Sequence, residues 1–381
     1  MKVVILATAI GPLNRGIGQY ERSLLPSLLS ALAAQGCEGT VILSRGSSLP
    51  PPPSGFRYAT LPVPAHISPL RFIAEQCCVP YWSAGADAFL SLDGVFPFSP
   101  VFAKRKIVVV HDIHVNRHVL DPKGYPEDYS WRYKLWASAA HRRAIKAADH
   151  IIAVSNFTAS EIGDVMHVPH DRITVAPNGV DQGKFQPVED RLCLEELRRR
   201  YNLPASFYLY VGPYSRKKNL RLIVDAYAAA KCCPDFLLPV VVVGSTRREP
   251  LYLSTMGRVR ETGLGGLFHF LGPVADEELV GLYTAARALI YPSLYEGFGL
   301  PVLEAMACGT PVVGSSRSSV PEVVGGAAIL VDPTSPETLI DALRRLTQEE
   351  VRNDLVARGF EQARQFTWNR TADLVSKALC A

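Results

Sequence analysis

The sequence predicts an α/β fold made of two Rossmann-like domains, each with a doubly wound parallel sheet. Short apolar runs alternate with helix-like segments along the chain, which is the pattern of parallel strands joined by crossover helices. The runs fall into two successive series, and 381 residues are enough for two domains of ordinary size. Several of the polar or glycine-rich segments directly follow an apolar run, at the strand end where open α/β sheets bind ligands.

The first series predicts an N-terminal domain over residues 1–180. Its strands are expected at residues 3–7, 40–43, 88–92, 107–110, 151–154 and 173–176. The proline- and serine-rich stretch 47–55 is expected to be an extended surface loop. The domain boundary is expected in Pro177–Asp181, because its Asn–Gly pair breaks both helix and strand.

The second series predicts a C-terminal domain over residues 181–364. Its strands are expected at residues 207–211, 240–243, 268–271, 288–291, 311–314 and 328–331. The remaining segment, residues 365–381, has apolar residues at helical spacing and predicts a last helix.

Composition excludes several classes of protein. The chain is 48% hydrophobic and 20% charged, and its net charge of +4 is too small to argue for nucleic acid. The eight cysteines include no CxxC pair, so free thiols are expected rather than a zinc site or disulfide framework. The apolar run at the N-terminus is too short for a signal sequence, and no stretch approaches a membrane span of about 20 residues. We therefore expect a cytoplasmic protein.

The most informative motif is a strand, a glycine-rich turn and a helix over residues 288–308. Pro301 suits the first turn of a helix, and Gly309 suits its end. The amides of Phe298, Gly299 and Leu300 would then face the sheet edge with the positive end of the helix dipole behind them, which suits a phosphate.

Two carboxylates frame this turn. Glu296 precedes Gly297 in the turn and Glu304 lies in the helix, where both can accept hydrogen bonds from the hydroxyl groups of a sugar. Together with the phosphate-binding amides, these carboxylates predict a donor site for a nucleotide sugar. The alternative is an ordinary strand–turn–helix unit with two solvated glutamates.

The run from Glu296 to Pro301, followed by Glu304, resembles the signature of the retaining glycosyltransferases of family four, which have the GT-B fold. The resemblance covers nearly the whole chain. It implies a cleft between the two domains, a last helix that crosses back onto the N-terminal domain, and retention of anomeric configuration. It also implies that Glu304 binds ribose hydroxyls and that Glu296 lies near the donor sugar.

A basic loop follows the first strand of the second domain. In the family, the lysine directly before Asn or Gly contacts the pyrophosphate, and that residue here is Lys218. Many relatives also have an arginine where this chain has Pro213, so Arg216 is the candidate for the second cationic contact. A solvated basic turn is the alternative. Gly244 and Val274 end other strands at the same edge and are expected to line the base and ribose.

In the N-terminal domain the resemblance implies two further site residues. Gly16 lies between the first strand and the first helix and corresponds to a glycine that approaches the donor phosphate. His111 follows a strand and corresponds to a histidine close to the donor sugar. His114 and His118 could form a metal cluster with it, but no acidic ligand stands at a fixed spacing, so we expect them to be structural.

No divalent metal is expected in the reaction. The sequence contains no Asp-x-Asp pair, the usual metal-binding motif of the other main glycosyltransferase fold. Lys218, Arg216 and the helix-end amides would neutralise the leaving group instead.

Residues 129–146 mix aromatic and basic side chains at helical spacing. The segment predicts either a surface helix that packs its aromatic side inward, which we favour, or a peripheral contact with the inner face of an anionic membrane.

The predicted function is transfer of a hexose, first of all mannose from GDP-mannose, onto a saccharide or lipid-linked saccharide in bacterial polysaccharide synthesis. UDP-glucose, UDP-N-acetylglucosamine and activated rhamnose are alternative donors. A non-catalytic subunit that binds sugar nucleotides, or an epimerase or phosphorylase of the same fold, are the remaining alternatives.

Overall fold

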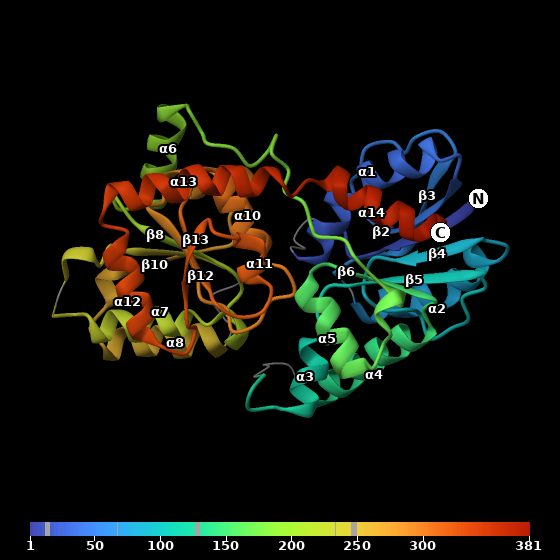
Figure 1. Ribbon diagram of the computed structural model, residues 1–381, viewed down its shortest axis with the longest axis horizontal. Helices are drawn as coiled ribbons and strands as arrows, with labels where there is room; N and C mark the ends of the chain where they lie inside the picture. Colours follow the sequence, from blue (N-terminus) through green and yellow to red (C-terminus); the bar gives the residue numbers. More distant parts are fainter. Residues whose placement is uncertain (12–15, 67, 126–129, 233, 245–249) are drawn as a thin grey trace. The chain divides into compact units, whose positions relative to one another are not determined.

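A computed structural model of the chain describes residues 1–11, 16–66, 68–125, 130–232, 234–244 and 250–381 (Figure 1). The chain divides into two compact units. The first comprises Met1–Leu120, Tyr129–Gly179 and Thr367–Ala381, and the second comprises Asp121–Asp128 and Val180–Phe366. The sequence predicts one continuous domain up to residue 180, whereas the second unit also includes the segment 121–128. There Tyr125 packs edge-on against Tyr295, with ring centroids 5.8 Å apart.

The first unit is built on a seven-stranded parallel sheet in the order β3-β2-β1-β4-β5-β6-β7. Its strands are β1 (Lys2–Ala7), β2 (Glu38–Arg45), β3 (Phe56–Pro64), β4 (Ala88–Ser91), β5 (Arg105–Val110), β6 (His150–Ala153) and β7 (Ile173–Val175). The central strands are buried on both faces, which is why their sequences are continuous apolar runs.

Strand β3 corrects the sequence prediction, which has six strands in this sheet. Residues 56–64 contain two prolines, Pro62 and Pro64, and alternate irregularly in polarity, so they do not read as a strand. The structure places β3 at the edge of the sheet, paired only with β2. Proline is tolerated at an edge because one side of the strand needs no hydrogen bonds.

Helices cover both faces of the first sheet. They are α1 (Ile17–Ala34), α2 (Ser68–Ser83), α3 (His114–Leu120), α4 (Trp131–Ala147), α5 (Asn156–Met166) and α14 (Trp368–Cys380), with a 3-10 turn η1 (His170–Arg172). Helix α14 lies beside α1 (Figure 1), and Ser27 Oγ of α1 donates to Asn369 Oδ1 of α14 over 2.8 Å. The last helix therefore belongs to the first unit although its sequence follows the second.

The second unit has a six-stranded parallel sheet in the order β10-β9-β8-β11-β12-β13. Its strands are β8 (Tyr208–Val211), β9 (Val240–Val243), β10 (Phe268–Gly272), β11 (Ala288–Tyr291), β12 (Val312–Ser315) and β13 (Ala328–Val331). All six lie within a residue of their predicted positions. The two parallel-sheet, Rossmann-like domains predicted from the sequence are confirmed.

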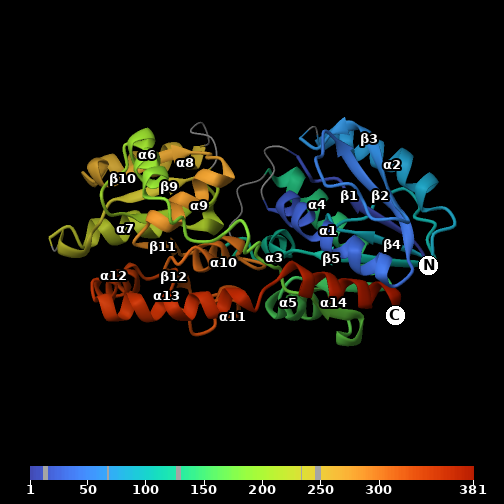
Figure 2. The ribbon, with the colours of Figure 1, turned by 90° about the horizontal axis from the view of Figure 1, so that it is seen from above.

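The helices of the second unit pack on both faces of its sheet. They are α6 (Arg191–Tyr201), α7 (Leu220–Ala229), α8 (Pro250–Glu261), α9 (Asp276–Ala285), α10 (Leu300–Ala307), α11 (Val320–Val324), α12 (Pro336–Arg345) and α13 (Glu349–Arg364), with 3-10 turns η2 (Arg216–Lys218), η3 (Pro234–Phe236) and η4 (Gly265–Leu267). Helix α10 packs on α13 (Figure 2), where Gly359 lets the backbone approach Met306. Helix α13 therefore packs against the C-terminal part of α10 and not against its N-terminal turn.

Each sheet has a point where the strand order reverses. In the second unit this point lies between β8 and β11, and in the first unit between β1 and β4. Loops that leave neighbouring strands on opposite sides open a crevice at such a point, where α/β proteins bind ligands. The loops after β8 and β11 carry Lys218 and Glu296, and those after β1 and β4 carry Thr8 and Asp93.

Helix α4 differs from the favoured prediction. Its aromatic side does not pack inward, because Trp131, Tyr133, Leu135 and Trp136 are all exposed, Trp131 by 66%. Only Trp136 has a ring neighbour on another helix, Phe72 of α2 at 5.7 Å, among the described residues. No helix in the described part of the chain has the length and apolar composition needed to cross a membrane.

Candidate functional site

The basic loop after β8 is fastened to the turn after β11. Asn219 caps η2 in the left-handed conformation, with φ 55°, which asparagine tolerates better than most residues. Its side-chain amide donates to the carbonyl oxygens of Pro292, 3.1 Å away, and Pro333, 2.7 Å away. The amide of Leu294 donates to the carbonyl of Lys217 over 2.7 Å. These bonds fix Lys218 beside the end of β11.

Lys218 and Glu296 form a nearly buried ion pair. The ammonium Nζ of Lys218 donates to Glu296 Oε1 over 2.7 Å and to the hydroxyl of Tyr291 over 2.6 Å. The two charged side chains are only 12% and 10% exposed. A lysine ammonium has three N–H donors, so one remains after the two acceptors found among the described residues.

Tyr291 stays neutral in this arrangement. Burial raises the pKa of its hydroxyl well above the ordinary value, and the charge of Glu296 raises it further. The neutral hydroxyl therefore accepts a hydrogen bond from Lys218 and adds no second negative charge beside Glu296.

The turn from Glu296 to Gly299 is held rigidly by two serines. Ser318 Oγ accepts a hydrogen bond from the amide of Glu296 over 2.9 Å. The buried hydroxyl of Ser319 lies 3.0 Å from the carbonyl oxygen of Glu296 and 2.9 Å from that of Phe298. Gly299 then takes φ 104°, a conformation that side chains disfavour, and α10 begins at Leu300. The helix ends at Ala307, one residue before the predicted position.

The amides of Phe298, Gly299 and Leu300 have no hydrogen-bond acceptor among the described residues. Phe298 and Gly299 are nevertheless buried. Because buried N–H groups are almost always paired, three unpaired amides in sequence mark a place where an anionic ligand can complete them.

Glu304 lies one turn into α10 and is mostly buried. Its Oε2 accepts a hydrogen bond from the hydroxyl of Tyr283 over 2.9 Å. Burial raises the pKa of Tyr283 well above its ordinary value, with a further contribution from Glu304. Burial also raises the pKa of Cys308, at the end of the helix, to about 12, again with a contribution from Glu304. Both neighbours therefore remain protonated, and Tyr283 fixes the direction of the carboxylate.

Three other predicted residues lie at strand ends of the same sheet. Gly244 follows β9, and a Cβ atom there would lie 2.4 Å from the carbonyl oxygen of Gly212, which follows β8. Glycine is therefore required for the two loops to approach each other. Val274 follows β10 and is buried, whereas Arg216 is exposed on η2.

Of the two predicted residues of the first unit, His111 directly follows β5 and Gly16 is the N-cap of α1. Gly16, at the start of α1, has φ 74°, while residues 12–15 before it lie outside the described residues. His111 Nε2 lies 2.8 Å from the carbonyl oxygen of Leu92 and must donate to it, so the lone pair is on Nδ1. Burial lowers the pKa of His111, which favours the neutral ring. Tyr20 packs edge-on against it at 4.7 Å.

A buried carboxylate cluster lies beside His111 and was missed by the sequence analysis. It consists of Glu21 of α1, Glu75 of α2 and Asp93 after β4, gathered around Thr8 after β1. These residues are far apart in the sequence and match no motif. Only the topology, which brings β1 and β4 together, reveals the cluster.

The hydrogen bonds of Thr8 show that one carboxyl group of this cluster is protonated. The Thr8 hydroxyl lies 2.6 Å from Glu75 Oε1 and 2.7 Å from Asp93 Oδ2. A hydroxyl has one hydrogen and can donate to only one of them, so the other carboxyl must be protonated and donate in return. Burial, followed by the charge of Asp93, raises the pKa of Glu75 to about 7. The proton is therefore assigned to Glu75, which donates it to the Thr8 hydroxyl, and Thr8 donates in turn to Asp93.

Glu21 holds a second proton in the same cluster. One of its oxygens, Oε2, accepts a hydrogen bond from the backbone amide of Ala9 over 2.9 Å. Burial raises the pKa of Glu21 well above its ordinary value, and the charge and hydrogen bond of Asp93 raise it further. The neutral form of Glu21 is therefore favoured. Arg71, 3.4 Å from Glu75, supplies the nearby positive charge.

Comparison with known proteins shows which family the chain belongs to. Family models described as "Glycosyl transferases group 1" and "Glycosyltransferase Family 4" match residues 195–365 and 25–184. The chain is 34% identical to O-antigen chain mannosyltransferase B of Escherichia coli, over 71% of this chain and 69% of that protein. The chain belongs to glycosyltransferase family 4. The resemblance stated from the sequence is thereby confirmed.

A second relative in sequence and a solved structure of similar fold add to this comparison. This glycosyltransferase is 31% identical to the D-inositol 3-phosphate glycosyltransferase of Corynebacterium glutamicum, over 78% of this chain and 69% of that one. Its fold resembles that of Anabaena Alr3699/HepE in complex with UDP-glucose, with a TM-score of 0.72 and 17% identity over 100% and 99% of the two chains. The structural likeness supports the GT-B fold.

In the second unit of the glycosyltransferase, the structure brings together most of the predicted site. Lys218 and Glu296 are in direct contact, and the turn amides and Glu304 follow on the same segment. Tyr291, Tyr283, Asn219 and Ser319 were not predicted, although Tyr291 is a tyrosine in an otherwise apolar strand. Among the described residues no group of three or more His, Cys, Asp or Glu side chains is arranged to hold a metal ion. The roles of the site residues stay predictions.

The carboxylate cluster predicts a pH-dependent stability. Because the folded protein holds the Glu75 proton up to a pKa of about 7, against 4.5 for the ordinary value, its stabilising effect is full below pH 4.5 and is lost as the pH rises through 7. The loss is on the order of 3 kcal/mol. Glu75→Gln keeps a donor toward Thr8 and does not ionise. Thermal unfolding should therefore show this variant gaining stability over wild type as the pH rises.

The matched control is Glu38→Gln, which removes an exposed carboxylate from the same unit. Its stability should follow that of the wild type at every pH. A constant difference between Glu75→Gln and wild type from pH 4.5 to 8 would contradict the assigned proton.

Proposed function

We propose that this glycosyltransferase transfers a mannosyl residue from GDP-mannose to a saccharide or lipid-linked saccharide acceptor in bacterial polysaccharide synthesis, with retention of anomeric configuration. The observation that carries the proposal is the position of Lys218. Its ammonium is held by Tyr291 and Glu296, and the three unpaired amides that open α10 follow Glu296 on the same segment.

The proposed role of Lys218 is to neutralise the departing diphosphate. Glu296 and Tyr291 take two of its N–H donors and aim the ammonium, and the third donor is left for a phosphate oxygen. The amides of Phe298, Gly299 and Leu300 add fixed dipoles to the same charge. Donors that are already oriented stabilise a developing anion without the reorganisation that water would need. Arg216, exposed on the same loop, is the proposed second cation.

The two glutamates have different proposed partners. Glu304, whose direction is fixed by Tyr283, would accept hydrogen bonds from the ribose hydroxyls. Glu296, paired with Lys218, would accept hydrogen bonds from the donor sugar. Gly244 and Val274 would line the base and ribose, because they follow neighbouring strands at the same sheet edge.

Metal-independent catalysis is part of the proposal. The sequence has no Asp-x-Asp pair, and Lys218 with the helix-end amides supplies the positive potential that a divalent ion would otherwise provide. In the first unit, Gly16 and the neutral His111 keep their predicted roles near the donor phosphate and the donor sugar. The leaving phosphate would itself help to deprotonate the acceptor.

The choice of mannose rests on the relatives. The E. coli relative is a mannosyltransferase, and it is 34% identical over most of both chains. UDP-glucose is the second candidate donor, because the HepE structure of the same fold contains it. The identity of 17% to that protein makes this the weaker of the two arguments.

Replacement of Lys218 tests the proposed site. Lys218→Ala should lower kcat at least about a hundredfold, because one well-placed donor of this type contributes about 3–4 kcal/mol to the transition state. Glu296 would lose its counter-ion, so the fold must be checked by circular dichroism and thermal unfolding. Lys231→Ala, an exposed lysine of the same unit, is the control and should keep full turnover. Full turnover in folded Lys218→Ala would contradict the assignment.

A panel of nucleotides tests the donor and the absence of a metal. GDP and GDP-mannose should raise the unfolding temperature in the presence of EDTA, since a ligand at a hundred times its Kd adds about 2.7 kcal/mol of stability. UDP and UDP-glucose at the same concentrations should give smaller shifts. A shift from the uridine compounds alone would refute GDP-mannose. A shift that requires added Mn²⁺ would refute the metal-independent site.

A further inference from the structure

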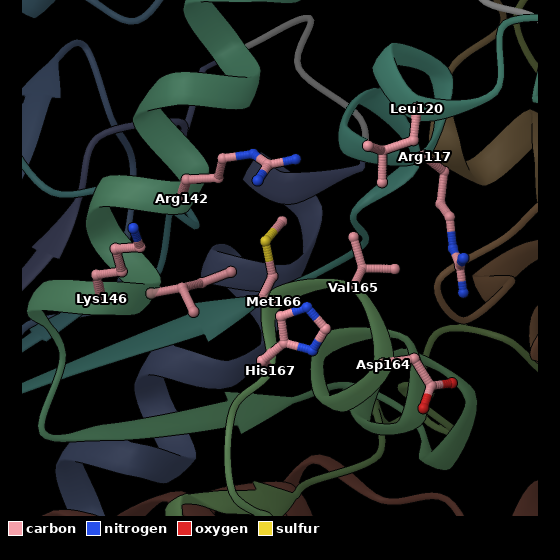
Figure 3. A pocket seen from close by; sticks show the side chains of 9 residues that line it. Arg117, Leu120, Arg142, Lys146, Asp164, Val165, Met166 and His167 are labelled. Carbon is pink, nitrogen blue, oxygen red and sulfur yellow. The ribbon is translucent and has the colours of Figure 1, made fainter.

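A basic pocket in the first unit lies among three helices, and none of its lining residues belongs to the proposed donor site. It has a volume of about 390 Å³ and is lined from α3, α4 and the end of α5. The lining side chains that Figure 3 labels include the cations Arg117, Arg142 and Lys146, together with His167 and one carboxylate, Asp164. Cations therefore outnumber anions on its wall.

Two of these cations have no partner within the described residues. Arg117 is compensated, because its guanidinium holds the carboxylate of Glu161, with Nε 2.7 Å from Oε2. Arg142 and Lys146 make neither a hydrogen bond nor an ion pair there. They stand one turn apart on α4 and both line the pocket (Figure 3). Like charges at this spacing repel each other by a few tenths of a kcal/mol, which a bound anion would reverse.

The rest of the wall is apolar. Leu120 of α3, Ile145 of α4, and Val165 and Met166 of α5 complete the lining. A small hydrophilic anion would use only the cationic side of such a pocket. A phosphate ester with a carbon body would use both sides.

We propose that this pocket binds the phosphate group of a phosphate ester, held by Arg142 and Lys146. Guanidinium and ammonium groups together are the usual partners of phosphate in proteins. His167, which ends α5 in the left-handed conformation with φ 54°, lies at the same wall. The proposal does not depend on the donor or on the reaction.

The phosphate could belong to a soluble ester or to a lipid headgroup, because both present the same chemistry. The composition of helix α4 favours a lipid headgroup, because its seventeen residues include five Lys or Arg and no Asp or Glu. Its first half exposes Trp131, Tyr133, Leu135 and Trp136. The experiment therefore uses two probes, glycerol 3-phosphate and phosphatidylcholine vesicles with or without phosphatidic acid.

The variants are Arg142→Gln and Lys146→Gln, each alone and combined, which keep the helix propensity and remove the charge. Arg132→Gln is the matched control, because it removes a charge from the same helix outside the pocket lining. Binding of glycerol 3-phosphate is measured by calorimetry and binding of vesicles by co-sedimentation. Any phosphate bound elsewhere is common to all variants, so the differences between them report on the pocket.

Each pocket substitution should weaken binding of at least one probe about tenfold, and the double substitution should abolish it. Arg132→Gln should stay within about twofold of wild type. Loss in both arms identifies the phosphate itself as the ligand, and loss with vesicles alone identifies a lipid headgroup. The proposal falls if the pocket variants bind both probes like wild type, or if neither probe binds.

Two further results would overturn the proposal. Equal weakening by Arg132→Gln would mean that diffuse positive charge, and no pocket, attracts the probes. A thermal midpoint that drops in the single variants, with unchanged phosphate affinity, would mean that Arg142 and Lys146 only complement the negative ends of α4 and α5.

Discussion

The ion pair between Lys218 and Glu296 is the constraint on which the second unit's site depends. A nearly buried pair of this kind is costly to form, and removal of either partner leaves an uncompensated charge. It is retained where the strand order reverses, between β8 and β11, where loops from two strands meet. Asn219 and the serines Ser318 and Ser319 hold those loops in place. The turn that opens α10 and a cation are thus presented together on a rigid sheet.

The first unit has its own reversal point, and its chemistry is different. There the loops after β1 and β4 carry Thr8 and Asp93, and the Thr8 hydroxyl lies between Glu75 and Asp93. Burial raises the pKa of both Glu21 and Glu75 in this cluster. The second unit instead has an ion pair, Lys218 with Glu296, at its reversal point.

The sequence predicted what local patterns determine. Buried parallel strands are continuous apolar runs, so every strand of the second sheet was found, and the turn at Gly299 was recognisable from its glycines and Pro301. Strand β3 was missed because its prolines are tolerated only at an edge, and the edge is a property of the assembled sheet. Tyr291 and the cluster of Glu21, Glu75 and Asp93 were missed because their partners are distant in sequence. Local sequence patterns cannot predict such contacts.

The most direct test of the proposed donor site is a crystal structure of the protein with GDP bound. A diphosphate oxygen should lie about 3 Å from Lys218 Nζ, within hydrogen-bond distance, with the amides of Gly299 and Leu300 on the same group. The ribose hydroxyls should lie at Glu304. A diphosphate bound away from Lys218 and α10, with the lysine still directed only at Glu296 and Tyr291, would contradict the proposed donor site.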